Sequence, residues 1–257
     1  MLTLFTALLV FLVLGVPVAY AFGLASLAYF LANSPDLLVA MPQRVFSGLN
    51  NYALISLPLF ILMGQVMNAS GITTRLIDLS MVLVGRLRGG LGLVNITASM
   101  IFGGISGSST SDTASIGAIM VPEMERRGYA KEFAAGITVA SSTMGMIIPP
   151  SIPIVLYAIV AQESIGKLFL GGVFPGLMIG VFQLGIMLWI AHRRNYPREV
   201  RVSSNETRTQ KFVGSFAVVL LPVVVVGSVT FGIATATESA AIGVVIALLV
   251  GGCRTFH

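Results

Sequence analysis

Two polar, glycine-rich interruptions of an otherwise apolar chain constrain its fold more than any other feature. They extend from Gly104 to Asp112 (GISGSSTSD) and from Ser141 to Ser151 (SSTMGMIIPPS), and both have strongly apolar flanks. In hydrocarbon an unpaired backbone amide costs several kcal/mol, so non-helical backbone at membrane depth is tolerated only where protein or a water-filled cavity covers it. Transporters use such interruptions to bind ions and substrates through freed carbonyls, hydroxyls and helix ends. The pattern therefore favours a transport protein.

The composition indicates what surrounds these interruptions. Of the 257 residues, 56% are hydrophobic and 10% are charged, whereas a soluble domain usually carries about 25% charged residues. The apolar runs are also long and continuous. We therefore predict an all-α polytopic membrane protein that lies in a lipid bilayer.

The net charge of +5 has a membrane explanation rather than a nucleic-acid one. The basic residues are spread through short loops, and the segment from His192 to Lys211 is the richest in them. Short basic loops are typical of the cytoplasmic side of a membrane protein, so we expect this segment there and expect no nucleic-acid partner. The single cysteine, Cys253, excludes an internal disulfide. With only His192 and His257, a histidine metal centre is not expected.

The first part of the chain is expected to contain retained membrane helices. Leu2 to Ala32 is long enough for one span, kinked at Pro17, and no Lys or Arg precedes Arg44, which argues against a secretory signal peptide. Further segments are expected as a short interfacial helix, a membrane segment broken near Pro58 and an amphipathic interfacial helix, at Leu37–Asn51, Tyr52–Met67 and Ile72–Leu87.

Both interruptions are flanked by helical segments too short to cross a bilayer. Leu91–Ile105 and Ser111–Met124 would each extend roughly 22 Å, against about 30 Å of hydrocarbon, so we predict a re-entrant hairpin. Glu132–Met146 and Ile152–Ala161 read as one discontinuous helix. Pro149 and Pro150 supply no amide hydrogen and disfavour helix in the residue before them, which leaves carbonyls from Gly145 to Ile148 free.

The remaining segments are expected to span the membrane. Leu168–Ala191 is long enough for one span, and its glycines at four-residue spacing predict close helix packing, at Gly172, Gly176 and Gly180. Phe212–Ile233 and Ala240–Val250 form one or two final segments. Between them, Glu238 lies in a Thr/Ser-rich stretch and is interpreted either as a helix cap or as a residue at the membrane interface.

The polar groups of the two interruptions suit a hard cation such as Na⁺. The first supplies a run of hydroxyls and one carboxylate, and the second supplies hydroxyls and freed carbonyls, so the two could enclose one ion. We assign a sodium site to Ser106, Ser108, Ser109, Asp112, Gly145 and Pro149, and substrate contacts to Thr110, Ser142, Thr143 and Ser151. The alternatives are tight packing of small residues, a capping role for Asp112, and a proline kink without a ligand.

Two other functions fit parts of this pattern. Gly104 to Gly107 match the Gly-x-Ser-Gly of rhomboid-type intramembrane serine proteases, but neither histidine is placed to act as a base at mid-membrane depth. An ion channel also uses carbonyls and polar rings, yet two unlike interruptions in one chain suit a transporter better. We therefore expect no enzyme activity and no organic cofactor.

Several motifs resemble the large membrane subunit of TRAP (tripartite ATP-independent periplasmic) transporters. They occur in order along the chain and read PQRVFSGL, LPLFILMG, GGL, FGGISGS, SST and IIPPSIP, starting at Pro42, Leu57, Gly89, Phe102, Ser141 and Ile147. The resemblance implies a sodium-coupled secondary transporter of the bacterial inner membrane. Its substrates would be organic acids, such as dicarboxylates or sialic acids, delivered by a periplasmic binding protein, and a small four-helix membrane subunit would complete it.

The resemblance also implies an elevator-type fold with two inverted repeats, each with a re-entrant hairpin and a broken helix. This sequence contains one hairpin motif and one Pro-Pro break, so we expect the first repeat of a C-terminally truncated subunit. The expected parts are scaffold helices with an interfacial arm in 1–70, the first half of the transport domain in 71–163, and a spanning helix, the basic loop and the start of the second half in 164–257.

Overall fold

The computed structural model describes residues 1–196 and 208–252, with side chains for 1–196 and 219–249. Throughout these residues the regular structure is helical, which confirms the predicted all-α class. The chain divides into two compact units, Met1–Asn51 and Tyr52–His257. The boundaries at residues 70 and 163 predicted from the sequence separate expected functional parts, not compact structural units, and they stay a prediction.

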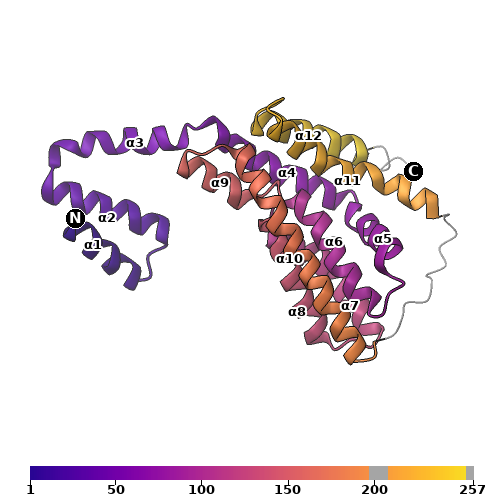
Figure 1. Ribbon diagram of the computed structural model, residues 1–257. Coiled ribbons are helices and arrows are strands. Elements are labelled where there is room, and N and C mark those ends of the chain that lie inside the picture. Colours follow the sequence, from indigo (N-terminus) through magenta and orange to yellow (C-terminus); the bar gives the residue numbers. More distant parts are fainter. Residues whose placement is uncertain (197–207, 253–257) are drawn as a thin grey trace. The chain divides into compact units, whose positions relative to one another are not determined.

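The first unit begins with a helical hairpin, so the prediction of one kinked span is wrong. Helices α1 (Leu2–Val13) and α2 (Val18–Asn33) lie side by side (Figure 1). The chain reverses at Gly15, whose φ of +77° is accessible to glycine at little cost, and Pro17 precedes the first residue of α2. Asn33 Nδ2 donates to Thr3 Oγ1 at 3.0 Å, which joins the end of α2 to the start of α1.

A predicted interfacial helix follows the hairpin. It consists of the 3₁₀ helix η1 (Pro35–Val39) and α3 (Ala40–Leu49), and its large apolar side chains are exposed. The helix is therefore confirmed, while its position at a membrane surface stays a prediction.

The second unit contains the remaining helices. In chain order they are η2 (Tyr52–Ile55), α4 (Ser56–Ala69), α5 (Ile72–Val84), α6 (Gly90–Ser106), α7 (Ser109–Arg126), α8 (Lys131–Ser142), η3 (Thr143–Met146), α9 (Ile152–Ala161), α10 (Ile165–Arg193), α11 (Arg208–Thr230) and α12 (Ala236–Gly252).

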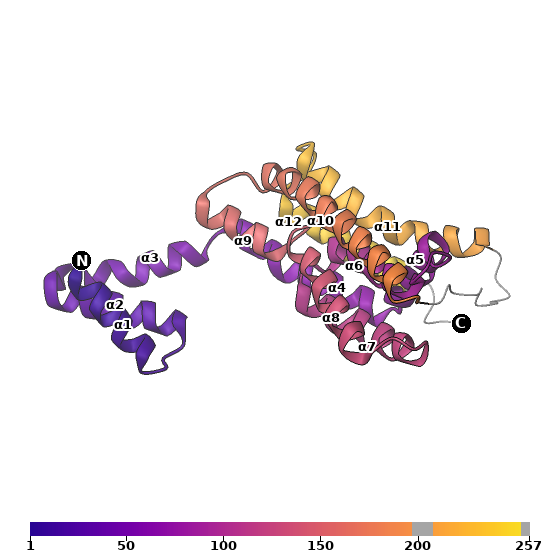
Figure 2. The same cartoon turned by 60° about the horizontal axis from the view of Figure 1, so that its bottom comes forward.

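Helix α6 is the centre of this unit. It contacts α4, α5, α7, α8, α10 and α11 (Figure 2). Most of its side chains are buried, including Leu91, Phe102 and Ile105. A helix that is apolar on all sides is buried on all sides, and the apolar run before the first interruption has this character.

Within the part of the chain that the structure describes, two helical segments are long and apolar enough to cross a membrane: Tyr52–Ala69 and Ile165–Arg193. The second confirms the predicted long span as a helix. The first contradicts the predicted break near Pro58, because Pro58 lies in the first turn of α4, where its missing N–H is not needed for a helical hydrogen bond.

The start of α12 confirms the capping role predicted for Glu238. One carboxylate oxygen of Glu238 accepts from the Thr235 backbone N–H at 2.8 Å and from its hydroxyl at 2.8 Å. The Glu238 N–H in turn donates to Thr235 Oγ1 at 3.3 Å. This reciprocal pair is a capping box.

Candidate functional site

The first interruption is much shorter than the sequence suggested. Helix α6 continues to Ser106 and α7 begins at Ser109, so only Gly107 and Ser108 lie outside helix. The sequence placed residues 106–110 between two helical segments, and this prediction is wrong for Ser106, Ser109 and Thr110, which are helical. Gly107 makes the turn with a φ of +61°, which glycine adopts readily.

Helices α6 and α7 form an antiparallel hairpin around this turn. Asn95, near the start of α6, points its Nδ2 at the sulfur of Met124, near the end of α7, at 3.7 Å. Gly107 and Ser108 are therefore the tip of a helical hairpin, as predicted. Whether this hairpin enters and leaves a bilayer on one side stays a proposal.

The second interruption confirms the predicted discontinuous helix. Helix α8 tightens into η3, residues 147–151 are not helical, and α9 resumes at Ile152. The peptide bond between Pro149 and Pro150 is cis. Ser151 donates its hydroxyl to the carbonyl oxygen of Met146 at 2.6 Å, which closes the loop over itself.

The two interruptions lie directly against each other. The Ile152 N–H donates to the Gly107 carbonyl oxygen at 3.2 Å. A Cβ on Gly107 would lie 2.8 Å from the carbonyl oxygen of Pro150, and a Cβ on Gly145 would lie 3.5 Å from that of Ser108. A site shared between the interruptions requires this juxtaposition.

Unpaired carbonyl oxygens gather at this junction. Among the hydrogen bonds of the described residues, none ends on the carbonyl oxygen of Gly145 or Ile148. The Ile147 carbonyl oxygen lies against α10 instead, because a Cβ on Gly172 of that helix would lie 2.7 Å from it. The interruption therefore frees part of its backbone, as Pro149 and Pro150 predict.

The tip hydroxyls contact one another and their own backbone. Ser106 is buried, and its Oγ lies 3.3 Å from the carbonyl oxygen of Ser108, to which it donates. Ser108 Oγ and Thr110 Oγ1 are 3.0 Å apart. Ser109 is half-buried and Thr110 is exposed. The tip thus presents the hydroxyls of Ser108, Ser109 and Thr110 at half-buried and exposed positions.

Asp112 lies one turn into α7 and is fully buried, with 0% of its surface exposed. Neither carboxylate oxygen has a hydrogen-bond partner among the described residues. The side chains of Ser142 and Ser99 lie beside it, but Ser142 donates to the carbonyl oxygen of Thr138 at 2.8 Å. The alternative in which Asp112 caps α7 through a hydrogen bond is therefore wrong, although its charge suits the first turn of a helix.

The predicted substrate residues fall into two groups. Ser142 and Ser151 are buried and donate their hydroxyls to backbone carbonyls. Thr110 and Thr143 are exposed. Thr143 donates to the carbonyl oxygen of Ala140 at 2.7 Å, within the turn that ends α8. Of these four, Thr110 and Ser151 belong to the segments that meet at the junction.

Helix α10 holds the second interruption in place through its glycines. A Cβ on Gly176 would lie 2.6 Å from Ile148 Cγ1, and one on Gly180 would lie 2.6 Å from the sulfur of Met100. The packing role predicted for these glycines is confirmed. What the sequence did not reveal is that Gly172 and Gly176 pack against the interruption itself.

Sequence reasoning also missed two polar residues on α6. Asn95 Nδ2 donates to Thr138 Oγ1 on α8 at 2.6 Å, and Ser141 Oγ donates to Ser99 Oγ at 3.0 Å. All four side chains are buried. The sequence feature that could have identified Asn95 and Ser99 is their four-residue spacing within an otherwise apolar segment.

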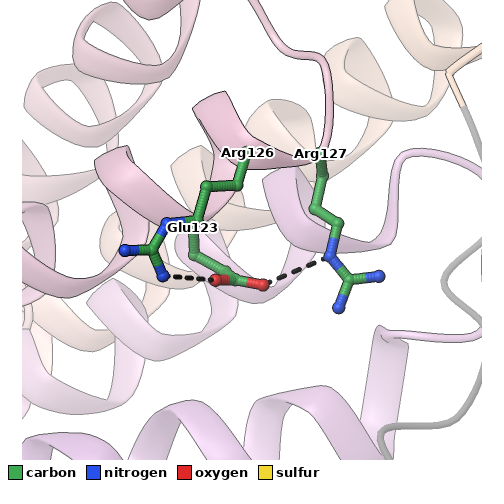
Figure 3. A network of polar contacts seen from close by, with 3 residues as sticks. All are labelled: Glu123, Arg126 and Arg127. Carbon is green, nitrogen blue, oxygen red and sulfur yellow. Dashed lines mark hydrogen bonds and ion pairs between the residues drawn. The ribbon is translucent and has the colours of Figure 1, made fainter.

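The far end of the hairpin carries charge. Glu123 pairs with Arg126 at 3.9 Å and with Arg127 at 3.2 Å (Figure 3), and Arg193 at the end of α10 stacks over Trp189 at 5.5 Å. Helix α7 has 18 residues, so its last residue, Arg126, lies about 27 Å from the tip at 1.5 Å per residue. Arginine and tryptophan at helix ends are typical of a membrane interface.

The arrangement does not resemble a serine protease site. Ser106 Oγ hydrogen-bonds the backbone of Ser108, and His192 Nδ1 is 3.3 Å from the carbonyl oxygen of Leu188 near the charged end of α10. Cys253 and His257, together with the loop residues 197–207, lie outside the described residues.

Comparison with known proteins is consistent with a transport site. A family model described as "Tripartite ATP-independent periplasmic transporter, DctM component" matches residues 5–255. The isethionate TRAP transporter permease protein DctMQ of Oleidesulfovibrio alaskensis is 38% identical over 241 residues, 94% of this chain and 38% of that protein. The sialic acid TRAP transporter permease protein SiaT of Haemophilus influenzae is 35% identical over 250 residues, 96% of this chain and 40% of that protein.

A third relative is a separate large permease. The C4-dicarboxylate TRAP transporter large permease protein DctM of Vibrio cholerae is 35% identical over 248 residues, 96% of this chain and 54% of that protein. The chain thus spans about 38 to 54% of the length of these relatives. All three are named permeases, which are not enzymes, and the prediction of no enzyme activity is confirmed.

Proposed function

The chain belongs to the DctM component family of TRAP transporters, and from that premise we propose that it forms a sodium site and part of an anion site in a sodium-coupled importer of organic acids. The family resemblance drawn from the motifs is thereby confirmed. Sodium coupling, the substrate and the partners are proposals, because the chain spans only part of its relatives.

The observation that carries the proposal is the meeting of the two interruptions around unpaired oxygens. Among the described residues, the carbonyl oxygens of Gly145 and Ile148 accept no hydrogen bond, and the hairpin tip lies against the second interruption at Gly107 and Ser108. Nearby, Asp112 keeps a buried carboxylate without a donor. Oxygen acceptors that lack donors in a buried place fit a hard cation, which would supply positive charge among them.

The residues of the sodium site have different tasks in this proposal. Ser106, Ser108 and Ser109 would offer oxygens from the tip, and Gly145 with the turn at Pro149 would offer backbone carbonyls from the opposite side. Asp112 would contribute charge one turn deeper. The hydrogen bond from Ile152 to Gly107 keeps the two sides together at 3.2 Å.

The helix starts beside this site suit the acid group of the substrate. Helices α7 and α9 both begin at the junction, and their N-caps, Ser108 and Ser151, make no side-chain capping hydrogen bond. Free amide groups and the helix dipole make the start of α7 favourable for an anion. The start of α9 adds mainly its dipole, because the Ile152 N–H bonds Gly107 and Pro153 has no N–H. Thr110, exposed in the first turn of α7, would contact the acid directly. Ser142 and Thr143 stay candidates for a substrate that extends toward α8.

The proposed coupling follows from this neighbourhood. Carbonyl and carboxylate oxygens at the junction repel one another, so the tip and the second interruption hold their positions best when the oxygens share a cation. The positions of the tip and of the second interruption also determine where the N-terminal ends of α7 and α9 lie. The cation and the acid would therefore bind with positive cooperativity, each increasing the affinity for the other by the same factor.

The proposed setting is the bacterial inner membrane, crossed several times. The charged ends of α7 and α10 would lie at the cytoplasmic surface. The tip, about 27 Å away along α7, would then remain within the hydrocarbon layer of about 30 Å, as a re-entrant hairpin. We propose an elevator-type transporter in which this chain supplies the first inverted repeat.

The partners would be a small membrane subunit and a periplasmic binding protein. Two relatives, one for sialic acid and one for C4-dicarboxylates, carry "TRAP transporter" and "permease" in their names. A tripartite system with a large permease implies two further components. An organic acid, such as a dicarboxylate or a sialic acid, is the substrate class that the amide ends suit.

The first experiment measures sodium binding by the chain itself. The chain is reconstituted in lipid nanodiscs and its thermal unfolding is followed as choline chloride is replaced by NaCl at constant ionic strength. A ligand that binds only the folded state raises the melting temperature, so we expect a saturable, sodium-specific rise. No rise would contradict the sodium site.

Matched variants locate the site. Ser108→Ala with Ser109→Ala should weaken the sodium response. Ser26→Ala with Ser70→Ala is the control, because both hydroxyls bond only carbonyls of their own helices. In a permease of full family length that contains this chain, saturable sodium-dependent uptake of a labelled organic acid is expected. Continuous ion conductance would instead indicate a channel.

A further inference from the structure

A line of contacts joins α6 and the turn after it to α8, η3 and the start of α9. In order toward the tip, the Asn95 side chain bonds Thr138 and Ser99 bonds Ser141. A Cβ on Gly103 would then lie 2.8 Å from Gly145 Cα, and the Gly107 carbonyl oxygen accepts from Ile152 at 3.2 Å. Residue numbers rise together on both sides, so α6 and α8 run parallel.

The spacing shows why these contacts belong together. On α6 they recur every fourth residue, and residues four apart share a face of a helix. We call the two hydrogen-bonded pairs, Asn95–Thr138 and Ser99–Ser141, the polar seam. The seam is continuous with the backbone contacts that bring the two interruptions together.

The Asn95–Thr138 pair has a defined direction. Thr138 donates its own hydroxyl proton to the carbonyl oxygen of Ala134 at 2.8 Å, so it accepts from Asn95 Nδ2 at 2.6 Å. Both residues are buried, and a buried donor that loses its partner is costly. Slipping α8 by one turn toward the tip would place Ala134 opposite Asn95, where the side chain offers no acceptor.

We infer that Asn95 and Thr138 are positioning residues, whose buried hydrogen bond fixes the register of the hairpin against the interrupted helix and thereby the meeting of Gly107 with Ile152. They act at a distance from the junction. Asn95 precedes Ser106 by three turns of α6, about 16 Å, and neither Asn95 nor Thr138 is among the residues assigned to the proposed sodium site.

Apolar packing and buried hydrogen bonds differ in how strictly they fix the register between two helices. The apolar side chains around α6 favour burial but tolerate small shifts, because dispersion and hydrophobic contacts are not directional. A buried hydrogen bond is directional, and single buried polar residues are known to fix register between helices. The polar seam would therefore select one register among several that bury similar surface.

The test variants separate the hydrogen bond from the shape of the residues. Thr138→Val keeps the shape and removes the acceptor, whereas Thr138→Ser keeps the hydroxyl and serves as the control. Asn95→Leu with Thr138→Val replaces both partners by apolar groups, which is often nearly neutral for stability. All are made in the complete chain in lipid nanodiscs.

The first readout needs no sodium. Hydrogen exchange is measured on a peptide that contains Ile152, whose amide bonds Gly107, and on a peptide of α12 as an internal reference. We expect Thr138→Val to speed exchange at Ile152 by about fivefold, the value of one lost hydrogen bond, with α12 unchanged. Thr138→Ser should behave as the wild type.

The second readout rests on the proposed function. The sodium concentration that gives half of the rise in melting temperature should increase by about fivefold in Thr138→Val and stay unchanged in Thr138→Ser. If the wild type shows no sodium response, the proposed function fails, and the exchange at Ile152 alone decides on the seam.

The outcomes are distinct. Wild-type exchange at Ile152 in Thr138→Val overturns the inference. If Thr138→Val speeds exchange everywhere, including α12, the variant is globally destabilised and the double variant Asn95→Leu with Thr138→Val is measured instead. If α12 is protected in the double variant but Ile152 still exchanges fast, the pair fixes the register. If Ile152 exchanges at the wild-type rate in the double variant, the pair contributes only stability and the inference is overturned.

Discussion

The backbone N–H of Ile152 donates to the carbonyl oxygen of Gly107 at 3.2 Å, and this single bond joins the start of α9 to the tip of the α6–α7 hairpin. It pairs two groups that helix geometry leaves unsatisfied, an amide from a helix start and a carbonyl from a turn. Each interruption thus satisfies part of the backbone of the other, which lets both exist in an apolar interior.

Gly107→Ala should destabilise the chain through two effects. Its φ of +61° is unfavourable for alanine, and the new Cβ would lie 2.8 Å from the Pro150 carbonyl oxygen. The matched control is Gly128→Ala, which has a φ of +88° but no neighbour within 4 Å. The backbone conformation costs about 1–2 kcal/mol in both, so the melting temperature should fall further for Gly107→Ala. Equal decreases would show that the two interruptions are not in firm contact.

Asp112→Asn should have opposite effects with and without sodium. Without a cation, an unpartnered buried carboxylate is costly, so the variant should melt at a higher temperature than the wild type in choline chloride. In NaCl the wild type should gain stability and the variant should gain less. Glu123→Gln, on the surface, is the control. A full sodium response in Asp112→Asn would remove Asp112 from the proposed site.

Gly176→Ala should disturb the second interruption from outside. Its Cβ would lie 2.6 Å from Ile148 Cγ1, whereas a Cβ on Gly185 of the same helix has no neighbour within 4 Å. Replacing an exposed helical glycine by alanine stabilises by roughly 0.5–1 kcal/mol, so Gly185→Ala should raise the melting temperature. Gly176→Ala should lower it and weaken the sodium response. Similar increases for both would contradict the close packing of α10 on the interruption.

Thr235→Ala should affect the start of α12 and leave the junction unchanged. It removes the hydroxyl that exchanges hydrogen bonds with Glu238, and the loss of such a cap costs about 1 kcal/mol. The melting temperature should decrease modestly and hydrogen exchange should increase in the first turn of α12. The midpoint of the sodium response should stay at its wild-type value; a large shift would show that α12 is coupled to the junction.

Local signals in the chain correctly located most helices. Glycine, proline and hydroxyl residues act on the backbone around them, so the hairpin tip, the discontinuous helix at Pro149 and the cap at Glu238 were all predictable. The errors also had local causes. A positive φ at Gly15 turned one expected span into a hairpin, and Ser109 and Thr110 were placed in the break although α7 begins at Ser109.

Sequence by itself determined that this chain is a helical membrane protein of the TRAP permease family and where its helices are interrupted, because composition, motifs and Gly/Pro chemistry act over short stretches. Only the tertiary structure decided which segments meet: the side chains of Asn95 and Thr138 lie 43 residues apart in the chain and 2.6 Å apart in space. Helical periodicity shows which face of a helix is buried but does not say against which partner or in which register. That choice depends on directional contacts between distant residues, and here it brings the two interruptions together.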